Sequence, residues 1–91
     1  ILDPGLGFAK ESEHNWALLN NLEKLETLGF PILIGASRKR FLGVLVGADT
    51  PDEREAATIA LTSLLAQRGT WGVRVHSVKP HRDAIAVAGR F

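Results

Sequence analysis

The feature that most constrains the fold of this 91-residue chain is a threefold alternation of short apolar runs and helical segments. Residues 1–2 resemble the end of a buried strand, residues 32–34 are apolar without alternation, and residues 72–75 form a third strand-like run. A continuous apolar run is typical of a strand covered on both faces. The alternation predicts a parallel sheet with right-handed crossovers. It fits an open doubly wound sheet or roughly three of the eight units of a closed barrel.

Two helices are expected before residue 50. Over residues 12–28 apolar side chains recur at steps of three and four, which predicts one amphipathic helix. Ser12 has the character of an N-cap, and Gly29 that of the residue beyond the C-terminal end. A shorter helix is predicted over residues 39–46, ending near Gly47.

Two further helices are expected in the second half. The run TPDE at residues 50–53 combines a capping threonine, a proline in the first turn and acidic residues at the positive end of the helix dipole. It predicts a helix to about Gln67. The last helix is expected to start at Pro80 and to reach about Ala88.

The composition excludes several classes of protein. A net charge of +1 gives no support for nucleic-acid or membrane-surface binding. The absence of cysteine excludes disulfides and thiolate metal sites, and it fits a cytoplasmic location. No apolar run is long enough for a bilayer span. Because the chain opens at Ile1, at the apparent end of a strand, we expect residues 1–91 to be a truncated or excised segment of a longer chain.

Chemically capable side chains follow each predicted strand. Ligands of parallel β/α proteins bind beyond the carboxyl ends of the strands, so one rim is expected to hold all of these residues. They are Asp3 after the first strand, Ser37, Arg38 and Lys39 after the second, and Arg74 and His76 at the end of the third.

Each of these groups also has a plainer interpretation. Asp3 precedes a Pro-Gly turn and could simply initiate it, or its carboxylate could accept two N–H donors from a flat heterocycle. The run GASRKR at residues 35–40 could be a solvated basic turn or an anion site made accessible by small residues. Arg74 and His76 share one face of their strand, where Arg74 could be salt-bridged inside the barrel or the two side chains could form an anion clamp.

Two other histidines, His14 and His81, fall in helical segments and are expected at the surface. No pair of histidine or acidic residues has metal-ligand spacing, and no Walker or dinucleotide-binding glycine motif is present.

Three motifs together resemble one known family. DPGLGF at residues 3–8, GASRKRFL at 35–42 and RVHSV at 74–78 are similar to the last three signature segments of dihydropteroate synthase, in order and spacing. The resemblance implies a single (β/α)8 barrel domain, of which residues 1–91 would be the C-terminal segment. It implies an enzyme of folate biosynthesis that joins 6-hydroxymethyl-7,8-dihydropterin diphosphate to p-aminobenzoate and releases diphosphate. It also implies a sulfonamide target, a homodimer, and Mg2+ bound with the diphosphate through a ligand outside this segment.

The resemblance also implies residue roles. Asp3, Gly35, Lys39 and Arg74 would bind the pterin. Arg74 and His76 would bind the diphosphate, and together with Lys39 they would be the catalytic residues. Pro4, Phe8 and Ser37 would bind p-aminobenzoate.

Two positions depart from the family pattern, since Leu6 stands where phenylalanine is common and Ser77 where aspartate is usual. The second change removes an acid expected to support the arginine or histidine of the motif. It keeps open a weakly active or inactive paralogue. Another pterin-binding barrel, such as a methyltetrahydrofolate methyltransferase, is a further alternative. The segment alone is expected to be inactive and only marginally stable.

Overall fold

The computed structural model describes residues 1–7 and 12–91, and three parallel strand segments run through it in chain order. Leu2 forms a parallel bridge with Ile32, and β1 (Leu33–Ile34) pairs in parallel with β2 (Gly72–Val73). The predicted parallel sheet is therefore confirmed. β2 is two residues shorter than predicted, although the N–H of Arg74 still donates to the carbonyl of Ile34 at 2.9 Å.

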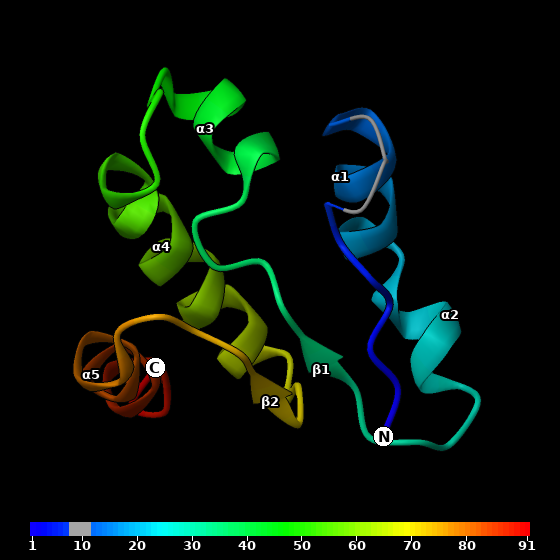
Figure 1. Cartoon of the computed structure of the whole chain (residues 1–91). Helices are drawn as coiled ribbons and strands as arrows, with labels where there is room; N and C mark the ends of the chain where they lie inside the picture. Colours follow the sequence, from blue (N-terminus) through cyan, green and yellow to red (C-terminus); the bar gives the residue numbers. More distant parts are fainter. Residues whose placement is uncertain (8–11) are drawn as a thin grey trace.

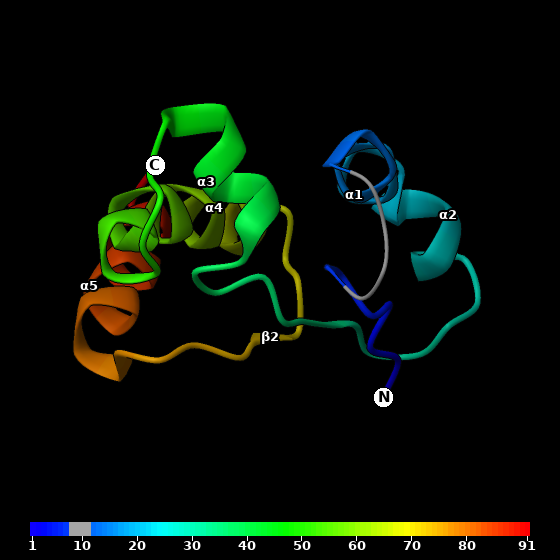
Figure 2. The same ribbon diagram turned by 45° about the horizontal axis from the view of Figure 1, so that its top comes forward.

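The helices lie beside the strands in two groups (Figure 1; Figure 2 shows them above the strand layer). One group lies near the N-terminal segment and the other follows β1 and β2 in the chain. The first contains α1 (Ser12–Asn20) and α2 (Leu22–Glu26), and the second contains α3 (Arg40–Val46), the 3-10 helix η1 (Asp52–Arg54), α4 (Glu55–Gln67) and α5 (Val78–Ala88).

The prediction of one helix over residues 12–28 is wrong, because the helix is interrupted at Asn21. Asn21 has φ −121° and ψ 27°, outside the helical region, and its side-chain amide donates to the carbonyl of Ala17 at 2.7 Å. Asparagine competes in this way with the helical backbone. The apolar stripe carries no sign of that break, since Leu19 and Leu22 on either side of it are both buried.

The other helix ends agree better with expectation. Gly47 ends α3 in the left-handed conformation, with φ 72°, as predicted. The third predicted helix starts with η1 and continues as α4 to Gln67. The start of α5 at Pro80 is wrong, since the helix begins at Val78. A proline in the first helical turn is compatible because the N–H groups there have no intrahelical acceptor.

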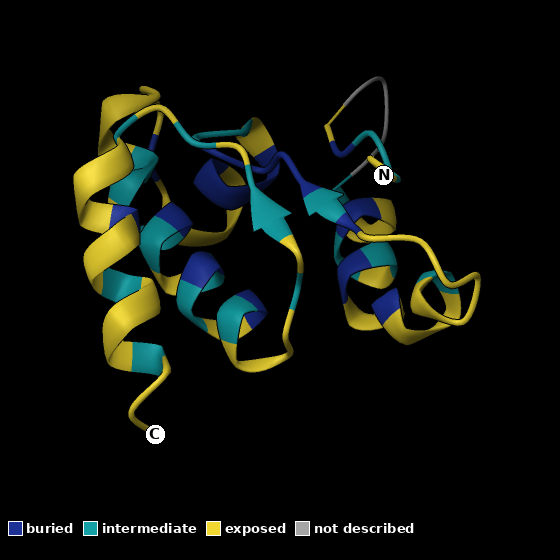
Figure 3. Cartoon of the chain, turned by 90° about the horizontal axis from the view of Figure 1, so that it is seen from below, coloured by how far each residue is buried: buried dark blue, intermediate teal, exposed yellow. Residues whose placement is uncertain are grey.

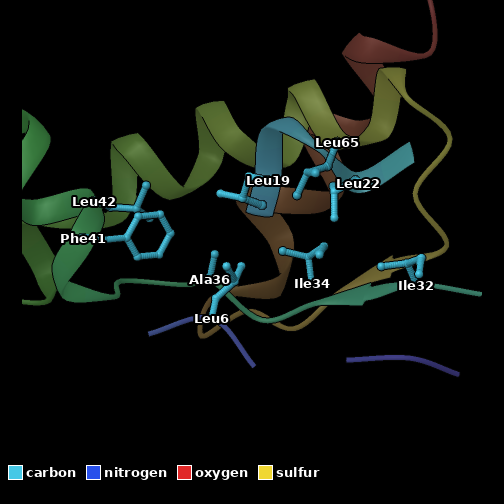
Figure 4. Packing of buried hydrophobic residues seen from close by; sticks show 9 residues of the cluster. All are labelled: Leu6, Leu19, Leu22, Ile32, Ile34, Ala36, Phe41, Leu42 and Leu65. Atoms are coloured by element: carbon cyan, nitrogen blue, oxygen red, sulfur yellow. The ribbon is translucent and has the colours of Figure 1, made fainter. Parts of the chain in front are cut away.

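The core lies between the strands and the inner faces of the helices. Figure 3 shows buried residues on the helix faces toward the strands and an exposed outer face on α5. Figure 4 shows the buried cluster, with Phe41 and Leu42 from α3 above the loop at residues 3–7, which we call the first loop, and Leu65 from α4 above β1. The cluster consists of Leu6, Leu19, Leu22, Ile32, Ile34, Ala36, Phe41, Leu42 and Leu65. This packing fixes the loops that leave the strands.

Candidate functional site

The structure brings the three strand ends together. Asp3 follows the first bridge residue, the loop at residues 35–39 follows β1, and Arg74 and His76 follow β2. Carboxyl ends of neighbouring parallel strands share one edge. Hydrogen bonds between side chains of the first and third segments, and of the second and third, confirm that this edge is a single cluster. We call Asp3, residues 35–39, Arg74 and His76 the rim.

Asp3 and Arg74 form an ion pair across the rim. Nη1 of Arg74 lies 2.8 Å from Oδ2 of Asp3, and the side chains are 52% and 37% exposed. The N–H of Gly5 donates to Oδ1 of Asp3 at 3.2 Å, so Asp3 also initiates the turn. Hydrogen bonds from Arg74 and then Gly5 lower the pKa of the Asp3 carboxyl below its ordinary value of 3.8. The pair is therefore charged at neutral pH and open to a ligand.

Gly35 provides the space that the Arg74 side chain occupies. A Cβ atom at residue 35 would lie 2.1 Å from Nη2 and 2.6 Å from Cζ of Arg74. Any side chain at residue 35 would therefore force the guanidinium to move. Gly35 therefore allows the guanidinium to cross the backbone of the second loop, which is the loop at residues 35–39, and to reach Asp3.

Ser37 and His76 are bonded to each other. Oγ of Ser37 lies 2.8 Å from Nδ1 of His76 and accepts the backbone N–H of His76 at 3.2 Å. With the hydroxyl donating to Nδ1, a neutral His76 carries its proton on Nε2. Ser37 is only 7% exposed, whereas His76 is exposed. The serine thus orients the imidazole.

Lys39 reaches from the second loop to the first. Its Nζ donates to the carbonyl of Leu6 at 2.5 Å. A Cβ atom at Gly7, which has φ 83°, would lie 2.7 Å from Cδ of Lys39, so the glycine is needed for this approach. Burial, followed by the positive charge of Arg74, lowers the pKa of the Lys39 amino group, and the charge of Asp3 opposes the shift. A cation in this position can donate to a ligand atom between the loops.

A second polar network lies behind the rim, and the sequence interpretation missed it. Arg38 donates from Nε to Oε2 of Glu55 at 2.6 Å, and Nε2 of His81 lies 2.7 Å from Oε1 of the same carboxylate. The expectation that His81 is at the surface is wrong, since it is 2% exposed. Its Nδ1 lies 2.7 Å from Oγ1 of Thr62. A histidine with two partners can be buried without an unsatisfied polar atom.

One signal for this network was present in the sequence. Thr58 and Thr62 are buried on α4 on the same face as Leu65. Threonine on the inner face of a helix requires a polar partner. Here the partners are the N–H of Arg38, at 3.0 Å from Oγ1 of Thr58, and the ring of His81.

The remaining predicted residues are placed as follows. Pro4 is half-buried in the first loop, and Arg40 is exposed at the start of α3. Phe8 lies outside the described residues. Oγ of Ser77 accepts Nη2 of Arg38 at 3.1 Å, so the position that usually carries an acid supports Arg38.

Within residues 1–7 and 12–91, no group of three or more histidine, cysteine or acidic side chains could hold a metal ion. Asp3, the acid of the rim, is paired with Arg74. Over the same residues, no helix combines the length and the apolar character needed to cross a membrane.

Several known proteins are similar to this chain in sequence and in fold. The family "Pterin binding enzyme" matches residues 1–76. Dihydropteroate synthase of Mycobacterium leprae (strain TN) is 57% identical over 96 residues, covering 100% of this chain and 34% of that protein. Two structures of dihydropteroate synthase from Thermus thermophilus, one in complex with 6HMPPP and one with 4-aminobenzoate, have a TM-score of 0.92 at 42% identity. They cover 99% of this chain, which spans 36% and 37% of those chains.

The structural likeness confirms the predicted fold class, part of a parallel (β/α)8 barrel. The resemblance drawn from the three sequence motifs is confirmed as well. The chain spans only 34% of the length of the Mycobacterium leprae relative.

Proposed function

Because the chain belongs to the family of pterin-binding enzymes, we propose that it is part of a dihydropteroate synthase of folate biosynthesis. The reaction joins 6-hydroxymethyl-7,8-dihydropterin diphosphate to p-aminobenzoate and releases diphosphate. The observation that carries the proposal is the exposed Arg74, held by Asp3 beside His76 at the strand ends. The relatives with bound 6HMPPP and 4-aminobenzoate support it.

In this proposal the pterin binds between the first and second loops. The Asp3 carboxylate accepts N–H groups of the ring, and the Lys39 amino group donates to a ring acceptor. Gly35 lets the ring and the Arg74 side chain approach the backbone.

Arg74 and His76 bind the diphosphate and stabilise its charge as it leaves. Breaking the bond between the methylene carbon and the diphosphate oxygen leaves a cationic methylene on the pterin. The nitrogen of p-aminobenzoate then forms the new bond to this carbon and releases a proton. A guanidinium that binds two oxygens, with an imidazole N–H beside it, favours this charge separation. Most of the rate is therefore expected from charge stabilisation and positioning.

Pro4, Phe8 and Ser37 are proposed to bind p-aminobenzoate, and sulfonamides would compete for the same place. Ser37 could contact the acid only by exchanging one of its two bonds to His76. Its contribution is therefore expected to come in part from the orientation of His76. Mg2+ is proposed to accompany the diphosphate through residues outside this chain, and a homodimer in the cytoplasm is proposed for the whole protein.

The proposal is tested on the full-length protein. We expect it to form dihydropteroate from the two substrates. Calorimetry with the pterin diphosphate and Mg2+ should show binding, weakened by Arg74→Ala and by Lys39→Ala. Arg82→Ala, which removes an exposed charge on α5, is the matched control. Unchanged affinity in both rim variants would refute the site.

The product assay also separates the alternatives. Ser77 is the residue that favours a weakly active paralogue. Its hydroxyl still accepts a bond from Arg38, whose charge is paired with Glu55 and Asp52, so the network is retained without an acid at residue 77. Pterin binding without product formation would indicate a paralogue, and methyl transfer from methyltetrahydrofolate would indicate the other barrel class.

A further inference from the structure

Arg38 has an unfavourable backbone conformation between two rim residues. Its φ of 56° is the only positive value among the non-glycine residues that the structure describes. The left-handed region is costly for a residue with a Cβ atom, so surrounding contacts must hold it there. Ser37 and Lys39, its direct neighbours, supply the bonds to His76 and to the first loop.

Those contacts come from the 3-10 helix η1, the helix α4 and the residue before α5. The Arg38 guanidinium donates to Glu55 at 2.6 Å, to Asp52 at 3.1 Å and to Ser77 at 3.1 Å. Its backbone N–H donates to Oγ1 of Thr58, and its carbonyl accepts Nη1 of Arg54 at 3.2 Å. Both the side chain and the peptide groups of Arg38 are therefore fixed from behind the rim.

Glu55 has the central place among these partners. The Asp52 side chain is 92% exposed, and water competes for its charge, whereas the Glu55 side chain is 19% exposed. Burial raises the pKa of the Glu55 carboxyl, but hydrogen bonds from Arg38 and His81 outweigh it and lower the pKa below its ordinary value. An ionised Glu55 thus receives one donor on each oxygen.

His81 fixes the direction of that carboxylate. Its Nε2 contacts Oε1 of Glu55, and its Nδ1 is hydrogen-bonded to Thr62, about two turns farther along α4. At 2% exposure the ring cannot turn away toward solvent. The path His81–Glu55–Arg38 runs from α5 through α4 to the loop of the rim.

We propose that Glu55 and His81 are positioning residues, which hold Arg38 in its left-handed conformation and thereby place Ser37 and Lys39 for substrate. This inference rests on the proposed function of the rim. Rotation of the peptide groups at residue 38 would move both neighbours at once. A displacement of about 1 Å of a positioning group can reduce the rate up to a hundredfold.

The experiment uses the full-length protein and four variants. Glu55→Gln leaves one acceptor oxygen for two donors, and His81→Leu removes the donor to Glu55. His81→Gln keeps an N–H donor at a comparable reach and serves as the rescue variant. Glu53→Gln, an exposed change in η1, is the control.

Two readouts are compared with thermal stability. The first is the backbone N–H resonance of Lys39, which donates to the carbonyl of Ala36 at 3.2 Å, in a nitrogen–proton NMR spectrum. The second is kcat/KM for p-aminobenzoate, measured well below the melting temperature. We expect Glu55→Gln and His81→Leu to shift the resonance and to lower kcat/KM about tenfold, with His81→Gln close to the parent protein.

A purely structural network would give a different result. Melting temperatures would fall while the resonance and kcat/KM stayed at parent values, and this outcome overturns the proposal. If His81→Leu does not fold, Glu55→Gln decides the matter alone. If the parent protein forms no dihydropteroate, the proposed function fails, and the Lys39 resonance then decides the positioning role: a shift in Glu55→Gln supports it and an unchanged signal overturns it.

Discussion

The guanidinium of Arg74 lies so close to the Cα atom of Gly35 that a methyl group on residue 35 would be 2.1 Å from Nη2. From this position Nη1 reaches Asp3 at 2.8 Å. The absence of a side chain at Gly35 therefore allows Arg74, which follows the third strand, to form its ion pair with Asp3 in the first loop. Three segments far apart in the sequence depend on the absence of one side chain.

Gly35→Ala is expected to displace Arg74 and to break its ion pair with Asp3. Real Cβ atoms do not approach other atoms so closely, and the backbone of residue 35 is fixed by its buried neighbours Ile34 and Ala36. Affinity of the full-length protein for the pterin diphosphate should fall about tenfold, which corresponds to about 1.4 kcal/mol. Isothermal titration calorimetry measures this change.

Gly89→Ala is the matched control for that substitution. A Cβ atom there would meet its nearest neighbour, the carbonyl oxygen of Ile85, at 3.5 Å, an ordinary contact far from the rim in the chain. Its affinity should equal that of the parent. Parent-like affinity in Gly35→Ala as well would show that Arg74 does not need this space.

The charge of Asp3 is expected to depend on Arg74. Because the hydrogen bond from Arg74 is the main cause of the lowered pKa of Asp3, Arg74→Gln should raise that pKa toward 3.8. A carboxyl with a lowered pKa stabilises the fold above its unfolded pKa, and the contribution is lost as the pH falls below about 4 through the folded value. NMR titration of the Asp3 carboxyl carbon in both proteins measures the shift.

The contribution to stability should be small. Both side chains are more than a third exposed, and exposed ion pairs contribute of order 0.5 kcal/mol. Salt at about 1 M should screen it further. Identical titration curves for the parent and Arg74→Gln would contradict the pairing.

Local patterns in the sequence predicted the element order and the rim. The apolar run at residues 32–34 and the left-handed Gly47 end of α3 follow from neighbours in the chain, and both were predicted correctly. The rim followed from topology, because parallel strands place their carboxyl ends together. These features depend on periodicity and on single-residue preferences.

The two errors have different causes. Asn21 lies beside an uninterrupted apolar stripe, and its side-chain hydrogen bond to Ala17, four residues earlier, shows why the helix breaks there. His81 has the sequence surroundings of a surface residue, and Glu55 and Thr62 on another helix make its burial possible. Periodicity carries no record of such pairs.

Phe41 is expected to be a major source of stability for the second loop. It is buried at the start of α3, and its ring meets Trp16 of α1 edge to face, with centroids 5.2 Å apart and planes at 77°. Phe41→Ala should lower the free energy of unfolding of the full-length protein by about 3–5 kcal/mol, since it leaves a cavity. Phe41→Leu should cost about 1 kcal/mol because much of the volume is kept.

Urea unfolding provides the measurement for both variants. Arg40→Ala, which removes an exposed charge at the start of the same helix, should change the free energy by less than about 0.5 kcal/mol. Equal effects of Phe41→Ala and Arg40→Ala would contradict the packing of α3 against α1.

The 91-residue chain, produced alone, is expected to unfold without a sharp transition. Its sheet has two paired strands and one bridge, and isolated sheets of this size are marginal in water. Large apolar side chains on several helices and loops are exposed, including Val44, Leu45, Leu64 and Trp71 at 60–65%. Burial of these groups against further protein would supply much of the missing stability. Calorimetry should therefore show a broad transition, and the dye ANS should bind to the chain; a single cooperative heat-absorption peak without dye binding would show that this part of the barrel folds independently.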